Sequence, residues 1–136
     1  MTANFSKQIL GSSLPHAFRK IRLELARERG HPDGDNRFSY TLIAPLDAAS
    51  RIDLETWRDH KEASRVVRQR PGEPDNSGHI IRTRNGAWAF HYDAHGGKPD
   101  ETGYRFADEE FAIGEYVSVV ENNKTHVYKV VAVEKL

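Results

Sequence analysis

The chain contains no cysteine among its 136 residues. This absence excludes a disulfide framework, a cysteine nucleophile and any metal site built on thiolates. A domain of this length buries roughly two-thirds of its unfolded surface, so one hydrophobic core is enough to hold it together without cross-links. A chain without cysteine also fits a reducing compartment, and we expect a cytoplasmic protein.

Long apolar runs and an excess of one charge are missing too. No segment approaches the ~20 apolar residues that cross a bilayer, so no membrane association is expected. The start of the chain lacks the basic and apolar regions of a signal peptide, and we predict a partly ordered arm (1–17) before a single β-rich domain (18–136). Twenty basic and twenty acidic side chains give a formal net charge of zero, which disfavours a protein built mainly to neutralise nucleic acid.

The motifs of common enzyme classes are also absent. The chain has no G-x-S-x-G, no G-x-x-x-x-G-K-[ST], no G-x-G-x-x-G and no H-E-x-x-H. We therefore expect a binding protein rather than an enzyme.

The chain is instead a series of short segments in which apolar and polar residues alternate, as in Lys20 to Arg27. Such alternation predicts half-buried strands. Residues 52–62 differ, because Leu54 and Trp57 are three apart and predict a short helix, with Ser50 as its cap. The fold expected is mainly β (α+β): a strongly curved antiparallel sheet or partly open small β-barrel of about 6–8 strands. The one short α-helix would cover an end or an open side.

Two hairpins carry asparagine at the turn. Asn85-Gly86 and Asn122-Asn123 both predict two-residue type I′ turns, in which both central residues have positive φ. The core-face pairs predicted for the first hairpin are Thr83 with Trp88, Ile81 with Phe90 and His79 with Tyr92. Those predicted for the second are Val117 with Tyr128 and Val119 with His126.

The other face of the first hairpin would present Arg82 and Arg84. Guanidinium groups bind carboxylates and phosphates, so this face is a candidate surface for an anionic protein or ligand. The strand before it would extend the surface if it lies alongside, with Arg65, Arg68 and Arg70. The simpler interpretation is that these residues are the solvated side of a sheet. Nucleic acid is not favoured, because the aromatic residues that would stack on bases are required by the core.

His91, Asp93 and His95 are spaced i, i+2, i+4 and would point the same way on a continuous strand. Two imidazoles and a carboxylate suit a divalent metal, so the alternative function is a small metal-dependent enzyme. Gly96-Gly97 argues against it, because glycines there would end the strand before His95. No other cofactor is predicted.

Three runs together resemble a family of small uncharacterised bacterial proteins: KIRLELARERGHPDGD, TLIAPLDAASRIDLETWRDH and FAIGEYVSVVENNKTHVYKV. The resemblance covers residues 18–134. It implies a single self-contained cytoplasmic domain, and it transfers no activity, cofactor, partner or functional residue.

Overall fold

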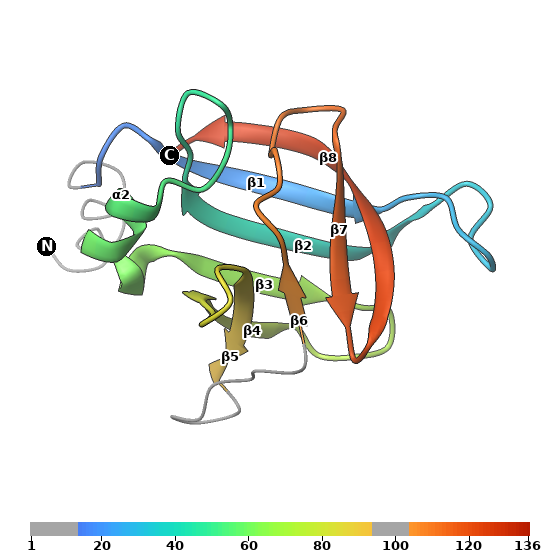
Figure 1. The fold of residues 1–136 in the computed structure, drawn as a ribbon. Coiled ribbons are helices and arrows are strands. Elements are labelled where there is room, and N and C mark those ends of the chain that lie inside the picture. Colours follow the sequence, from blue (N-terminus) through green and yellow to red (C-terminus); the bar gives the residue numbers. More distant parts are fainter. Residues whose placement is uncertain (1–13, 94–103) are drawn as a thin grey trace, which may run out of the picture.

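A computed structural model describes residues 14–93 and 104–136 of the chain. In it, every strand pairs with the next along the chain and the last pairs with the first, so the antiparallel sheet closes into an eight-stranded barrel (Figure 1). The strands are β1 (Phe18–Leu25), β2 (Asp35–Pro45), β3 (Arg65–Gln69), β4 (Asn76–Arg82), β5 (Trp88–Tyr92), β6 (Tyr104–Phe106), β7 (Tyr116–Glu121) and β8 (Lys124–Lys135). The predicted antiparallel β fold is confirmed.

Two short helical segments, α2 (Leu54–Asp59) and the 3-10 helix η2 (Lys61–Ala63), cover one end of the barrel, called here the helical end (Figure 1). The indole Nε1–H of Trp57 donates to the carbonyl of Ile80 at 2.9 Å, and its ring meets Trp88 edge-on at 5.2 Å. This docking confirms that the helix covers an end of the barrel. None of the helices in the described residues is long and apolar enough to span a membrane.

The short helix predicted at about 52–62 is present, but its predicted cap was wrong. The residue at the N-cap is Asp53 rather than Ser50, which has a φ of +63° and lies in the preceding turn. The α-helix has six residues. The chain then tightens into the 3-10 turn of η2, as commonly happens at a helix terminus.

Aromatic side chains fill the barrel. Trp88, Phe90 and Tyr92 on β5 point inward and are buried, as predicted. Tyr40 meets Phe90 and Tyr128 at ring-centroid distances of 5.0 Å. Each buried aromatic ring removes a large apolar area from water, and this burial stabilises the fold by about 25 cal/mol per Å². These rings therefore contribute much of the stability of the core.

The predicted register of the β4–β5 hairpin was wrong by one residue. The observed pairs are His79 with His91, Ile80 with Phe90, and Arg82 with Trp88. The turn has three residues, 84–86, closed by the Thr83 N–H donating to the Ala87 carbonyl at 2.9 Å. Gly86 has a positive φ of +80°, whereas Asn85 does not. A three-residue loop that ends in a left-handed glycine is the next commonest hairpin after the two-residue turn.

The β7–β8 hairpin follows the prediction. Asn122 and Asn123 have φ values of 50° and 71°, as a type I′ turn requires. Val117 pairs with Tyr128 and Val119 pairs with His126. The local turn chemistry therefore sets the register of this hairpin correctly.

Candidate functional site at the polar end of the barrel

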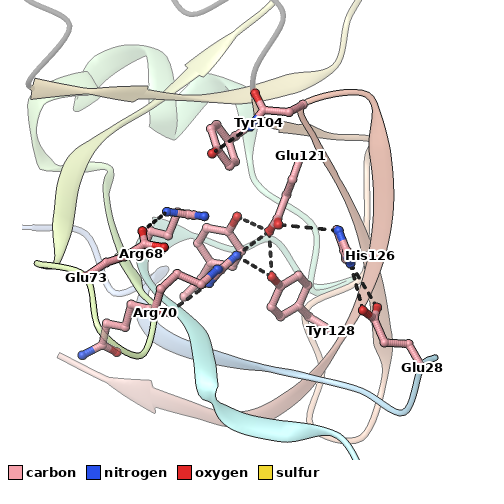
Figure 2. Close-up of polar contacts among 11 residues, drawn as sticks. Glu28, Arg68, Arg70, Glu73, Tyr104, Glu121, His126 and Tyr128 are labelled. Carbon is pink, nitrogen blue, oxygen red and sulfur yellow. Dashed lines mark hydrogen bonds and ion pairs between the residues drawn. The ribbon is translucent and has the colours of Figure 1, made fainter. Parts of the chain in front are cut away.

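The end of the barrel opposite α2 is filled by polar side chains, and we call it the polar end. Its members are Tyr40, Arg68, Arg70, Glu121, His126 and Tyr128 (Figure 2). They point inward because strand residues alternate between faces. Val66 is buried in the core, so Arg68, two residues further along β3, lies on the same face.

An ion pair between Arg70 and Glu121 lies at the centre of the polar end (Figure 2). Arg70 Nη2 is 2.8 Å from Glu121 Oε2, and the two side chains are 5% and 11% exposed. Arg70 also donates to the Tyr128 hydroxyl at 2.7 Å and to the Gln69 carbonyl at 2.9 Å. Since the pair joins β7 to the end of β3, it holds opposite sides of the barrel together.

Glu121 is held in its ionised form. Burial alone would raise the pKa of its carboxyl group, but hydrogen bonds from Tyr128 and Tyr40, together with the charge of Arg70, lower it below its usual value. Tyr128 donates to Glu121 Oε2 at 2.6 Å, and Tyr40 donates to the same oxygen. Charge-assisted bonds of this kind are stronger than neutral ones. The carboxylate therefore organises three donors around one oxygen.

Three buried tyrosines should resist ionisation while the barrel is folded. Burial is the largest cause that raises the pKa of Tyr40, Tyr92 and Tyr128 above the ordinary tyrosine value. Because the pKa is raised only in the folded state, the resulting stability is present below about pH 10, where a free tyrosine ionises, and is lost as the pH rises further. An alkaline titration followed by phenolate absorbance and circular dichroism should show at least three of the five tyrosines ionising only on unfolding. Ionisation of all five near pH 10 in a folded barrel would contradict this.

His126 stands between two carboxylates (Figure 2). Its Nδ1 is 3.0 Å from Glu28 Oε1, and its Nε2 is 4.0 Å from Glu121 Oε1. Glu28 belongs to the loop between β1 and β2, so this contact ties that loop to the rim of the polar end.

Arg68 is the member of the polar end whose hydrogen bonds are least complete. Its side chain is 16% exposed, and its guanidinium carbon lies 5.0 Å from the centre of the Tyr104 ring. Within residues 14–93 and 104–136, its buried Nε has no hydrogen-bond partner. The ion pair that it forms is with Glu73, at 3.5 Å, and that carboxylate is 58% exposed. A cation partly removed from water is thus left with one long ion pair and the face of one aromatic ring.

The five arginines predicted to share a surface do not gather on one face. Arg65 lies on the outside of the barrel, where it contacts His79 at 2.9 Å and Asp93 at 3.2 Å. The guanidinium of Arg82 lies 4.6 Å from the centre of the Trp88 ring. Arg84 is exposed in the hairpin turn. Only the remaining two, Arg68 and Arg70, come together, inside the polar end.

The candidate metal set is only partly described, because His95 lies outside the described residues. His79 and Arg65 contact the carboxylate of Asp93. In the part of the chain that the structure describes, no group of three metal-ligating side chains comes together. The metal site stays a prediction.

Sequence reasoning missed Tyr40, Glu121, His126 and Tyr128 as members of a site. A signal was nevertheless present in the alternation itself. Val117 and Val119 face inward, so Glu121 is the next position on the core face of β7. A charged residue at a core position of a strand requires a partner. The alternation of β3 on the opposite side of the barrel, continued one residue past its end, supplies Arg70 as that partner.

Comparisons with protein-family models, with curated proteins and with solved structures found no match.

Proposed function

We propose that the protein is a non-catalytic binding module for a ligand that carries a carboxylate or a phosphate, and that Arg68 receives this group. The observation that carries the proposal is the incomplete hydrogen bonding of Arg68. Its Nε lacks a partner among the described residues, and its contact with Glu73 is long. Burying a charge without a full set of partners costs free energy, and an anionic ligand at the exposed part of the guanidinium would offset that cost.

The neighbouring Arg70 is not available for the same role. Its Nη2 already contacts Glu121 and Tyr128, and its Nη1 donates to a backbone carbonyl. A ligand anion would also meet the carboxylate of Glu121 and be repelled. Arg70 is therefore assigned to stability and Arg68 to binding.

The surroundings of Arg68 favour an anion. The planar guanidinium can form two parallel hydrogen bonds with a carboxylate or phosphate. The Tyr104 ring lies against the guanidinium and restricts its movement. Tyr92 keeps its proton, because burial raises the pKa of its hydroxyl. The nearby tyrosine therefore carries no competing negative charge.

Glu73 competes with the ligand anion for Arg68. Its exposed carboxylate is free to swing away when a ligand arrives, because an exposed ion pair contributes only about 0–1 kcal/mol. Two variants of this one ion pair should therefore change affinity in opposite directions. Glu73→Gln should bind anions about two- to fivefold more tightly, which corresponds to removing that contact. Arg68→Gln should lose binding.

Isothermal titration with inorganic phosphate and with benzoate, at constant chloride, tests the proposal. Arg65→Gln is the matched control, since Arg65 lies outside the barrel and is already held by His79 and Asp93. We expect the control to bind as the wild type does. The proposal fails if Arg68→Gln binds either anion as the wild type does. It also fails if neither anion binds with a dissociation constant below about 10 mM.

A further inference from the structure

A groove of about 1000 Å³ runs along the outside of the barrel. Its floor is the outer face of β7 and β8, and one wall is the loop between β1 and β2, residues 26–34, which projects beyond the barrel (Figure 1). We call this loop the arm, as distinct from the N-terminal arm predicted for residues 1–17. The floor residues are Tyr116, Val127, Lys129 and Val131.

The floor is unusually apolar for the outside of a strand. Tyr116, Val127 and Val131 are three of the five exposed large apolar side chains in the described part of the chain. On β1, by contrast, the outward positions Lys20 and Arg22 are polar. Exposed apolar side chains that gather on one face favour contact with another molecule.

The charges around the floor indicate what covers it. Arg27 and Asp33 on the arm and Lys129 on the floor form no ion pair with any other described residue. The groove therefore offers free charges of both signs, with an acid on the arm and a base on the floor. A two-fold interface needs such self-complementarity, because the same patch contacts itself. The formal net charge of zero also removes long-range repulsion between copies.

The arm is ordered before any partner arrives. Its base is fixed by the Ala26 N–H, which donates to the Val127 carbonyl at 2.9 Å, and by the contact between Glu28 and His126. Reciprocal backbone hydrogen bonds of 3.0 and 2.9 Å between Glu28 and His31 close its tip. An element that is already rigid loses little conformational entropy on association.

From these observations we infer that two copies of the chain associate through this groove, each laying its arm on the β7–β8 floor of the other. Val127 and Val131 are covered by the partner. Asp33 of one copy pairs with Lys129 of the other, and the symmetry repeats the pair. The groove lies outside the barrel, whereas the proposed anion site at Arg68 lies inside it.

Sedimentation velocity across protein concentrations from about 1 μM to 1 mM, the range of weak to moderate affinities, tests the inference. We expect the wild type to dimerise and Val127→Glu combined with Val131→Glu to remain monomeric with an unchanged circular dichroism spectrum. Leu136→Glu is the control, because Leu136 is an exposed apolar residue outside the groove, and this variant should dimerise like the wild type.

A charge exchange identifies the pair across the interface. Asp33→Lys and Lys129→Asp should each weaken the dimer, and the double variant should restore it. A wild type that is monomeric at every concentration, including one that binds a different protein instead, would overturn the inference. So would a valine double variant that still dimerises, or a charge exchange that restores nothing.

Discussion

Replacing Glu121 with leucine is expected to lower the free energy of unfolding by about 3–5 kcal/mol. The change leaves Arg70 charged and buried without its counter-ion, since the guanidinium is only 5% exposed. It also removes the acceptor of the Tyr40 and Tyr128 hydroxyls. Chemical denaturation followed by tryptophan fluorescence measures the loss.

A second substitution separates the charge from the packing. Adding Arg70→Met to Glu121→Leu should restore part of the lost stability, because two apolar residues replace a broken ion pair. Glu73→Gln is the control, since it breaks an ion pair whose acid is 58% exposed and should cost no more than about 1 kcal/mol. If Glu121→Leu costs as little as this control, the Arg70–Glu121 pair does not stabilise the barrel as described.

Replacing Gly78 with alanine is expected to be similarly severe, with a loss of about 3 kcal/mol or more. Gly78 pairs with Tyr92 across β4 and β5. A Cβ atom at Gly78 would lie 2.1 Å from the carbonyl oxygen of His91 and 2.7 Å from the Cα of Tyr92. Both are backbone atoms, so the strands themselves would have to separate.

Gly72→Ala is the comparison for this substitution. Gly72 has a φ of +77°, but a Cβ atom there would meet nothing within 4 Å. Its cost should therefore be only the backbone strain of about 1–2 kcal/mol. Denaturant unfolding of both variants checks the difference. Equal losses at the two positions would show that the close approach of β4 and β5 is not what requires glycine.

The fold was largely predictable because its signals are local. Alternation identified the strands, and Asn122-Asn123 set the register of β7 and β8 correctly. Asn85-Gly86 failed because the same dipeptide suits both a two-residue and a three-residue turn, and only packing selects between them. In the barrel Ile80, rather than Ile81, lies opposite Phe90. Closure of the sheet could not be predicted from the sequence either, because the pairing of β1 with β8 joins strands that are distant along the chain.

The site was less predictable than the fold. The arginines of β3 were predicted to lie on an outer face beside Arg82 as candidates for anion binding, whereas Arg68 and Arg70 lie inside the barrel. The missing step was to apply the alternation to β3 itself. Val66 is buried, and residues 68 and 70 lie on the same face of the strand, so Arg68 and Arg70 face the inside of the barrel. The distinction between a satisfied Arg70 and an incompletely bonded Arg68 depends on the distances and exposure of their contacts with Glu121 and Glu73, which alternation alone does not give.

The central claim is that Arg68 receives an anion, and its side-chain Nε–Hε resonance tests this most directly. The resonance is assigned by its disappearance in Arg68→Lys, and inorganic phosphate is then added to the wild type at constant chloride. We predict that the Arg68 resonance shifts with saturation, because the anion binds the partly exposed guanidinium group to which this Nε belongs, while that of Arg65 stays in place. An Arg68 resonance that does not move, or that moves only as much as Arg65, would contradict the account.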